Sequence, residues 1–254
     1  MSSPQQTMTI LRELRLSSMA QAYQQQLDMP RLHELSFDER LALLVEHESS
    51  DRQSRKLNRL IRAAGLPQPA ALEDADYRAS RGIDKAHLAS LATCDWVRRQ
   101  QHLVILGPTG VGKTWLACAL ATQACRQDLS ATFYRVSDLC NDVAVSVLDG
   151  SLPRLKVLLT KPKLLVLDDF GLGELSPLTG QVIFDVIDRR MTWGSLLITS
   201  QYPIEKWHGF FHDPTLADAV LDRIVHVAHR ISLKGESMRK LLAKKQMQPV
   251  AASK

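Results

Sequence analysis

Residues 107–114 constrain the fold of this chain more than any other part of it, because they spell Gly-Pro-Thr-Gly-Val-Gly-Lys-Thr between two apolar stretches. The stretch before them, 102–106, is strand-like, and the stretch after them, 115–124, is helix-like. A strand that enters a glycine-rich turn and leaves it as a helix points backbone N–H groups and the positive end of the helix at one place. Such a turn cradles phosphate groups, so the pattern predicts a P-loop that binds ATP or GTP.

The residues of this P-loop have separate expected roles. Its glycines let the backbone approach an anion without a Cβ in the way. Lys113 is expected to reach the β- and γ-phosphates, and the Thr114 hydroxyl is expected to hold Mg²⁺. The residues expected to bind the nucleotide are Gly107, Pro108, Thr109, Gly110, Val111, Gly112, Lys113, Thr114 and Trp115.

Two acidic residues end a second apolar stretch. Asp168 and Asp169 come directly after residues 164–167, and a buried strand that ends in a carboxylate is the pattern of a Walker B motif. We expect Asp168 to lie near the Mg²⁺, directly or through a water molecule. Asp169 is expected to orient or deprotonate the attacking water.

Polar side chains also end a third apolar stretch, 196–198. Gln201 is our first choice for a sensor of the γ-phosphate or the attacking water, and Ser200 is the second. Two arginines complete the candidate site: Arg223 follows an amphipathic stretch, and Arg239 lies near the start of the last expected helix. From the residues alone, either arginine could simply be a surface ion-pair partner, which is the commoner case.

From about residue 84 onward, strand-like and helix-like stretches alternate, which predicts an α/β fold with a parallel sheet. The expected strands are 103–106, 132–136, 164–168, 196–200 and 227–233, and the expected helices include 137–148 with Ser137 as N-cap, 178–191 and 216–224. Five strands joined by crossovers form an open, doubly wound sheet that binds its ligand at the carboxyl ends of the strands. The aromatic segment 207–211 is expected in the core rather than at a partner surface.

The first part of the chain reads as helical. One helix is expected over 8–27, and a second follows a capping box at 36–39 and continues to residue 64. The expected organisation is a helical domain at 1–66, a linker at 67–83 and a P-loop domain at 84–254 with a basic tail.

Composition excludes several classes of protein. No stretch approaches the roughly 20 apolar residues that a membrane span requires. The first residues lack the charged and apolar regions of a secretory signal. The four cysteines show no Cys-x-x-Cys spacing, which favours free thiols in a reducing cytoplasm over a zinc site.

The net charge of +5 is unevenly distributed. Residues 234–254 carry six lysines or arginines and one acid, which accounts for the whole excess. A second cluster, which we call the basic stripe, falls on one face of a helix and consists of Arg52, Arg55, Lys56, Arg59 and Arg62. Each cluster alone is equally well explained as a solvated surface. Beside a nucleotide site, the two together favour salt-sensitive, sequence-independent contact with nucleic-acid phosphates.

Five motifs in this order resemble a known family. They are the P-loop, Leu-Asp-Asp-Phe-Gly at 167–171, Ile-Thr-Ser-Gln-Tyr-Pro at 198–203, Glu-Lys-Trp-His at 205–208 and Gly-Glu-Ser-Met-Arg at 235–239. The chain resembles IstB-like proteins, which are AAA+ ATPases that bacterial insertion sequences encode beside their transposase, IstA. These proteins are similar to the DnaC helicase loaders. The resemblance covers nearly the whole chain, including its helical N-terminal region.

The resemblance implies roles for three residues. Gln201 takes the sensor-1 place, Arg223 looks like an arginine finger that reaches the nucleotide of a neighbouring subunit, and Arg239 looks like a sensor-2 residue that acts on its own subunit. It also implies ATP and Mg²⁺ as cofactors and a homo-oligomer with ATP at subunit interfaces. The implied function is an ATPase that assembles on duplex DNA, stimulates an IstA-like transposase and so regulates DNA transposition.

Three alternatives stay open. A replicative helicase loader has the same chemistry and a different partner. A nucleotide-dependent binding module hydrolyses almost nothing. A metabolic P-loop kinase needs an acceptor-substrate site or a lid, and the sequence offers no sign of either.

Overall fold

The computed structural model describes residues 3–77, 82–225, 228–238 and 240. The chain divides into two compact units, Met1–Arg59 and Leu60–Lys254, which we call the helical unit and the sheet unit. Helix α3 (Phe37–Ala64) runs through the boundary between them. Among the described helices, none combines the length and the apolar character that crossing a bilayer requires.

The helical unit contains α1 (Pro4–Glu13), α2 (Ser17–Asp28), a short 3₁₀ helix (Pro30–Glu34) and most of α3. The prediction of one helix over 8–27 is wrong, because the chain turns at Arg15, whose φ of 60° is left-handed. No glycine or proline marks this break in the sequence. The predicted capping box is confirmed: Ser36 Oγ accepts from the N–H of Glu39, and the Glu39 carboxylate accepts from the N–H of Ser36.

Carboxylates of α3 hold the start of α2. Glu48 is 4% exposed and accepts the N–H groups of Ser18 and Met19, each at 3.0 Å. The N-terminal N–H groups of a helix have no partner within the helix, so a carboxylate placed there stabilises both the donors and the helix dipole. Arg52 in turn donates to Glu48 at 2.7 Å. The two helices are therefore joined by charge as well as by apolar packing.

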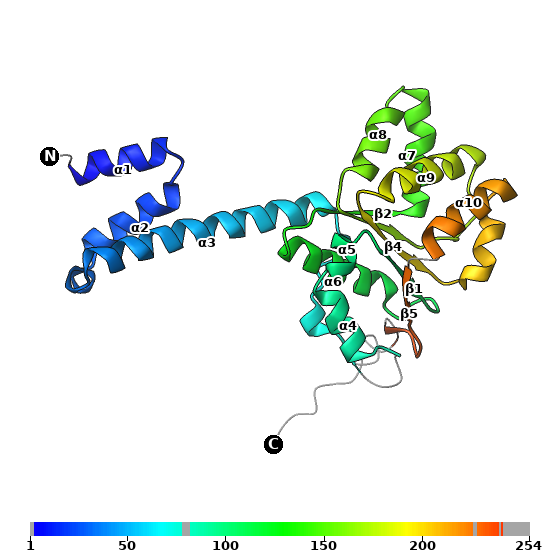
Figure 1. Ribbon diagram of the computed structural model, residues 1–254, viewed down its shortest axis with the longest axis horizontal. Helices are drawn as coiled ribbons and strands as arrows, with labels where there is room; N and C mark the ends of the chain where they lie inside the picture. The colour runs from blue at the N-terminus through cyan, green and yellow to red at the C-terminus, as the bar shows by residue number, and fades with distance from the viewer. Residues whose placement is uncertain (1–2, 78–81, 226–227, 239, 241–254) are drawn as a thin grey trace, which may run out of the picture. The chain divides into compact units, whose positions relative to one another are not determined.

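The sheet unit is built on five parallel strands in the order β2-β3-β4-β1-β5 (Figure 1). The strands are β1 (His102–Leu106), β2 (Ala131–Arg135), β3 (Leu164–Asp168), β4 (Ser195–Ser200) and β5 (Ala228–Ser232). The predicted doubly wound α/β sheet is confirmed, and each predicted strand is found within about one residue of its bounds. Val136 is the exception, since it begins a helix instead of ending β2.

Helices cover both faces of the sheet (Figure 1). On one face lie α4 (Lys85–Ala92), α5 (Asp95–Arg98) and α6 (Lys113–Arg126). On the other lie α7 (Val136–Leu148), α8 (Leu152–Thr160), α9 (Pro177–Arg190) and α10 (Pro214–Val225). The prediction of Ser137 as an N-cap is wrong, because α7 starts one residue earlier and Arg135 occupies the cap position.

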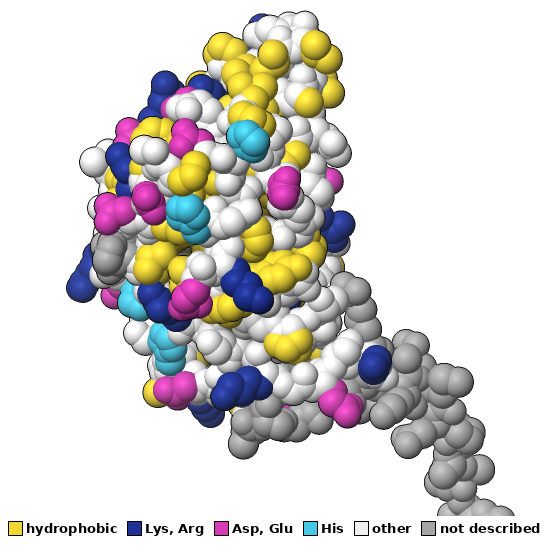
Figure 2. Space-filling view, turned by 90° about the vertical axis from the view of Figure 1, so that its right-hand side faces the viewer, with side chains coloured by type: hydrophobic (Ala, Val, Ile, Leu, Met, Phe, Trp, Pro, Cys, Tyr) yellow, Lys and Arg dark blue, Asp and Glu magenta, His cyan; other side chains and the backbone are white. Residues whose placement is uncertain are grey.

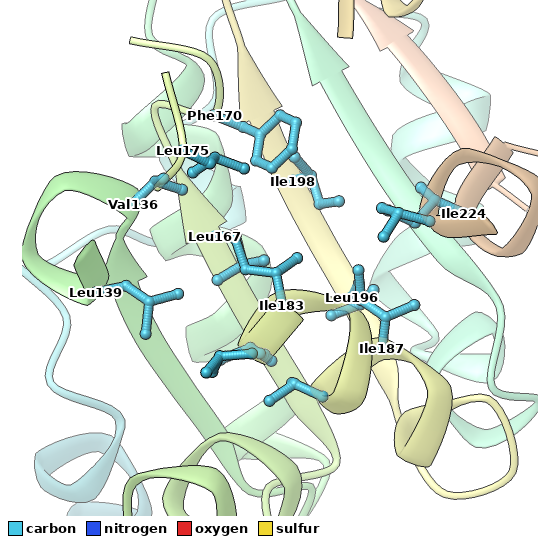
Figure 3. Packing of buried hydrophobic residues seen from close by; sticks show 14 of the residues in the cluster. Val136, Leu139, Leu167, Phe170, Leu175, Ile183, Ile187, Leu196, Ile198 and Ile224 are labelled. Carbon is cyan, nitrogen blue, oxygen red and sulfur yellow. The ribbon is translucent and has the colours of Figure 1, made fainter. Parts of the chain in front are cut away.

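The main apolar core lies between the sheet and the second layer of helices (Figure 3). Leu167, Leu196 and Ile198 of the strands are almost completely buried, as are Ile183 and Ile187 of α9. Burying a side chain of this size contributes roughly 1.5–3 kcal/mol. The same core takes in part of the aromatic segment: Trp207 is 0% exposed and Phe211 is 7% exposed, which confirms their predicted core location.

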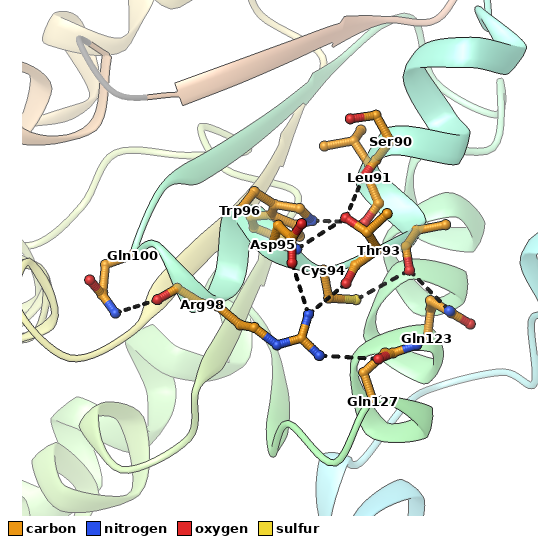
Figure 4. Close-up of polar contacts among 11 residues, drawn as sticks. Ser90, Leu91, Thr93, Cys94, Asp95, Trp96, Arg98, Gln100, Gln123 and Gln127 are labelled. Atoms are coloured by element: carbon orange, nitrogen blue, oxygen red, sulfur yellow. Dashed lines mark hydrogen bonds and ion pairs between the residues drawn. The ribbon is translucent and has the colours of Figure 1, made fainter.

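Polar contacts fix the first layer of helices (Figure 4). Gln123 of α6 donates to the carbonyl of Ala92 at 3.0 Å, and Arg98 donates both to Thr93 and to Gln127. These bonds anchor the turn between α4 and α5 on α6. Since α5 leads directly into β1, they also position the strand that enters the P-loop.

Candidate nucleotide site

The loop 107–112 connects β1 to α6 as the P-loop pattern predicts. Gly110 and Gly112 have φ values of 84° and 101°, which favour glycine over any residue with a Cβ. A Cβ on Gly110 would collide with the side chain of Ser237. The next residue, Met238, donates its N–H to the Gly110 carbonyl at 2.8 Å. Ser237 and Met238 therefore pack directly on the loop.

Lys113 is held inside this loop. Its side chain is 6% exposed, and Nζ donates to the carbonyls of Gly107 and Pro108 at 2.9 and 3.1 Å. An ammonium group at this position brings a positive charge to the cavity that the N–H groups of a P-loop face. It can exchange a carbonyl partner for a phosphate oxygen with a small movement, because the lysine stem is flexible.

Thr114 and Asp168 meet below the loop. The Thr114 hydroxyl donates to the Asp168 carboxylate, with its oxygen 2.9 and 3.1 Å from Oδ2 and Oδ1. Thr199, at the end of β4, donates to Oδ1 of the same carboxylate at 2.6 Å. The Thr199 oxygen also accepts the N–H of Asp169 at 3.0 Å. Two neighbouring strands and the first turn of α6 thus converge on one carboxylate.

Burial dominates the electrostatics of Asp168. Its side chain is 0% exposed, and burial raises the pKa of the carboxyl above its ordinary value, while the hydrogen bond from Thr199 lowers it. A carboxylate and a hydroxyl are hard oxygen ligands of the kind that Mg²⁺ prefers. Among the described residues, no group of three or more His, Cys, Asp or Glu side chains is placed to hold a metal ion. By their chemistry, the oxygens of Thr114 and Asp168 suit Mg²⁺.

Asp169 follows directly and differs from Asp168 in its backbone. Its φ of 57° is left-handed, a conformation that aspartate tolerates better than most residues. The turn breaks the strand after Asp168, and Asp169 lines the cavity described below. The same conformation occurs at Arg15, Cys94, Gln100 and Asp128. The backbone of Asp169 therefore fixes the turn, and its candidacy as the base rests on its place in the motif and in the cavity wall.

The two sensor candidates differ in what they contact. Gln201 Oε1 accepts from the hydroxyl of Thr109 in the P-loop at 2.7 Å. Ser200 is 0% exposed, and its hydroxyl donates to the Phe170 carbonyl at 2.7 Å and accepts the N–H of Tyr202 at 3.1 Å. Gln201 therefore contacts the loop that would hold phosphate, whereas the Ser200 hydroxyl bonds only to backbone groups, those of Phe170 and Tyr202.

A cavity of about 580 Å³ opens beside the loop. Six predicted site residues line its phosphate end: Thr109, Gly110, Val111, Gly112, Lys113 and Thr114. Trp115 and Asp169 line it as well. Sequence reasoning missed the rest of the wall, to which 67–83 contributes Pro67, Gln68, Asp74, Asp76 and Ile83. An ion pair of 2.7 Å between Glu73 and Arg126 fastens this segment to α6.

Arg135 also lines the cavity and was not predicted to do so. It ends β2, and its Cα is the register partner of Asp168 on the adjacent strand. A basic residue in the position that ends a strand beside the Walker B strand is the signal that could have identified it.

The two predicted arginines have different outcomes. Arg223 lies on α10 and is outside the set that lines the cavity; it pairs with Asp188 of α9, with Nη2 and Oδ1 2.9 Å apart. Arg239 lies outside the described residues, although its neighbour Met238 lines the cavity.

The basic stripe of α3 is divided by its ion pairs. Arg52 contacts Glu48 at 2.7 Å, and Arg55 contacts Asp51 at 2.9 Å. Arg59 and Arg62, further along the helix, are exposed. The acidic partners of Arg52 and Arg55 come from the helical turn at the start of the stripe.

Comparison with known proteins identifies relatives over almost the whole length. The family model described as "IstB-like ATP binding protein" matches residues 9–247. A protein of Sinorhizobium fredii named as an insertion sequence ATP-binding protein is 42% identical over 92% of this chain and 96% of its own length. A similarly named protein of Geobacillus stearothermophilus is 30% identical over 89% of this chain and 90% of its own.

Solved structures share the fold of the sheet unit. DnaI matches with a TM-score of 0.56 at 21% identity, over 70% of this chain and 94% of that structure. The DnaC helicase loader matches with a TM-score of 0.53 at 22% identity, over 68% and 99%. DnaA of Aquifex aeolicus, bound to the ATP analogue AMPPCP, matches with a TM-score of 0.55 at 17% identity, over 71% and 55%. At these identities the likeness concerns the AAA+ fold alone.

Proposed function

The chain belongs to the family of IstB-like ATP binding proteins, and from this premise we propose that it is an Mg²⁺-dependent ATPase that regulates DNA transposition. The observation that carries the proposal is the junction of Thr114, Asp168 and Thr199 beneath the P-loop. It joins the expected metal ligands to the backbone of the expected base. The insertion-sequence relatives, matched over about nine tenths of the chain, supply the biological context.

The chemistry assigned to the site is hydrolysis of the terminal phosphate. Lys113 and the N–H groups of the loop bind the β- and γ-phosphates, and Thr114 and Asp168 are the protein ligands for Mg²⁺. When bound, the ion neutralises charge on the phosphate oxygens. Asp169 accepts a proton from the attacking water, and Gln201 orients that water or the γ-phosphate.

Topology supports the assignment of Arg223 to a neighbouring copy. In a parallel sheet, a crossover helix runs back from the carboxyl ends of the strands to the amino end of the next strand. Arg223 is near the end of α10, five residues before β5 begins. Its backbone therefore lies toward the amino ends of the strands, whereas the P-loop follows the carboxyl end of β1. Its guanidinium is engaged by Asp188 and Ala219, and Arg223 is not among the residues that line the cavity of its own subunit. In an assembly with ATP at the interfaces, it serves the triphosphate of a second copy.

Surfaces of both units support assembly on DNA. Apolar side chains gather where α7 and α8 meet, at the top of Figure 2, and Leu148 there is 88% exposed. Exposed apolar patches commonly mark protein contacts, which suits a neighbouring subunit or the transposase. Arg59 and Arg62 are exposed cations that suit the phosphate backbone of a duplex. ATP binding promotes the assembly in this scheme, and hydrolysis dismantles it.

ATP turnover measured with and without duplex DNA tests the proposal, with Lys113→Ala as the inactive reference. We expect wild-type protein to hydrolyse ATP, to do so faster with duplex, and to sediment as an oligomer when ATP and DNA are both present. Nucleotide binding without turnover would identify a binding module instead. Lone subunits that ignore both nucleotide and duplex would contradict the assembly.

A pull-down separates the two partner classes. The purified chain, loaded with ATP, is offered an IstA-like transposase and, separately, a replicative helicase. Retention of the transposase is the expected result. Retention of the helicase alone would reassign the protein to the helicase loaders, whose fold it shares.

A further inference from the structure

Arg223 is held on three sides by its own subunit. Its Nε donates to Oδ1 of Asp188 at 3.0 Å, and its Nη2 forms an ion pair with the same oxygen at 2.9 Å. Its Nη1 donates to the carbonyl of Ala219, one turn earlier in α10, at 2.9 Å. The guanidinium carbon lies 4.9 Å from the ring centroid of Phe184, which covers one face of the group.

The contacts leave part of the guanidinium available. The group has five N–H donors in a planar fork. Nε and Nη1 each donate one, to Asp188 and to Ala219, and Nη2 is ion-paired with Asp188. At least two N–H groups on the terminal nitrogens remain beyond these contacts. Arginine N–H groups of this kind bind phosphate oxygens.

We propose that Asp188 and Phe184 are positioning residues that present the remaining N–H groups of Arg223 to the triphosphate of a second copy of this chain. The inference rests on the proposed role of Arg223 in trans and adds how the side chain is kept ready for it. A free arginine side chain samples many rotamers, and ordering it at the interface would cost entropy. Here the ordering is done within the subunit, so the guanidinium is preorganised before the subunits meet.

The surrounding surface suits contact with a protein. α9 and α10 pack against each other on one face of the sheet (Figure 1). On the described part of the face that includes α10, Lys and Arg side chains are interspersed with Asp, Glu and His (Figure 2). A polyanionic duplex favours a surface of continuous positive charge. A surface that carries both positive and negative side chains instead suits another protein surface that also carries both.

Turnover of Asp188→Ala in the presence of duplex DNA tests the proposal, beside Arg223→Ala and the double variant. We expect Asp188→Ala to reduce kcat at least tenfold, toward the level of Arg223→Ala, and the double variant to lose no more than Arg223→Ala alone. ATP affinity of isolated subunits should stay at the wild-type value in all three. Asp188→Asn, which keeps a neutral acceptor, should retain more activity than Asp188→Ala.

Subunit mixing separates positioning from a general structural defect. Lys113→Ala subunits lack a working nucleotide site but carry intact Arg223 and Asp188. Mixed with Asp188→Ala subunits, which have an intact nucleotide site, they should restore part of the turnover. Asp185→Ala is the matched control, because it removes an ion pair with Lys156 from the same helix, and it should turn over at the wild-type rate.

The outcomes distinguish the inference from the proposed function. Wild-type or faster turnover by Asp188→Ala, while Arg223→Ala is slow, would overturn the positioning role and leave Arg223 as the trans residue. Failure of mixing to restore any turnover would also overturn it. Wild-type turnover by Arg223→Ala would remove the trans role itself and this inference with it, while the ATPase assignment would stand.

Discussion

The hydroxyl of Thr199 joins the two acids of the Walker B segment, because it donates to the Asp168 carboxylate at 2.6 Å and accepts the backbone N–H of Asp169 at 3.0 Å. One buried oxygen thereby sets both the orientation of the expected metal ligand and the turn that carries the expected base. The three residues of β4 just before Thr199 are apolar and buried. Thr199 is therefore the residue through which this strand contacts the two acids.

Thr199→Val keeps the shape of the side chain and removes both bonds. We expect a loss of about 1–3 kcal/mol in the free energy of unfolding, because a buried acceptor and a buried donor lose their partner. We also expect a clear fall in ATP turnover. Ser195→Ala is the control, since it removes a buried hydroxyl from the start of the same strand, where it contacts Trp96 and Val97. Denaturant unfolding and steady-state turnover check the pair; equal turnover in both variants would contradict the linkage.

The raised pKa of Asp168 makes stability depend on pH in a definite direction. Burial places the folded-state pKa above the unfolded value, which is about 3.9 for aspartate. The contribution of this carboxyl to stability is therefore full below the unfolded pKa and is lost as pH rises through the folded pKa. At neutral pH and without Mg²⁺, Asp168→Asn removes the cost of a buried charge, so we expect it to be more stable than wild type.

The stability gain of Asp168→Asn should shrink as pH falls below the folded pKa, because wild-type Asp168 is then protonated as well. Chemical denaturation in EDTA at a series of pH values measures the difference. The variant should also lose Mg²⁺-dependent turnover, so stability and activity change in opposite directions. A variant that is less stable than wild type at every pH would contradict this account of the carboxyl.

Asp169→Asn separates the base from the backbone. Asparagine tolerates the left-handed φ of 57° found at this position, so the turn should survive the change. We expect ATP affinity to stay at the wild-type value and kcat to fall about 10²- to 10⁴-fold, the usual contribution of a general base. Single-turnover hydrolysis and equilibrium binding measure the two quantities. A wild-type kcat would transfer the role of base to another group.

The parts of the site that follow one another in the chain could be predicted from the sequence. The P-loop and the Walker B strand each combine a hydrophobic pattern with polar residues at fixed offsets, and local pattern is what sequence reveals most directly. The break at Arg15 left no such mark, because a non-glycine residue in a left-handed conformation carries no compositional signal. The sequence likewise shows no sign that α7 begins at Val136, one residue before the expected cap at Ser137.

Contacts between distant segments could not be predicted. Residues 67–83 look like a linker because they contain prolines and acids and lack periodicity, yet Pro67 and Ile83 line the cavity. Their position depends on how α6 and the sheet are assembled. The pair of Asp188 and Arg223 is likewise separated by 35 residues and arises only when α9 and α10 pack together. Both the cavity wall from 67–83 and the pair of Asp188 and Arg223 exist only in the folded protein, so local sequence patterns do not reveal them.

The ion pairs of α3 also refine the prediction for DNA. All four arginines of the stripe are exposed, but Arg52 and Arg55 are paired with acids of their own helix. Arg59 and Arg62 lie three residues apart, on one face. Replacing both Arg59 and Arg62 by Ala should weaken duplex binding equally for unrelated sequences, because contacts to phosphate carry no sequence information. The slope of log affinity against log salt should decrease in magnitude by about one to two units.

Arg12→Ala combined with Arg31→Ala is the matched control for the DNA prediction. This variant removes the same charge from two exposed positions outside α3 and should leave the salt slope at the wild-type value. Fluorescence anisotropy with labelled duplex, titrated at several salt concentrations, measures both variants. An equal change in the two would indicate that net charge alone attracts the duplex, because a general field weakens with any lost cation, whereas a phosphate contact is lost only where it is made.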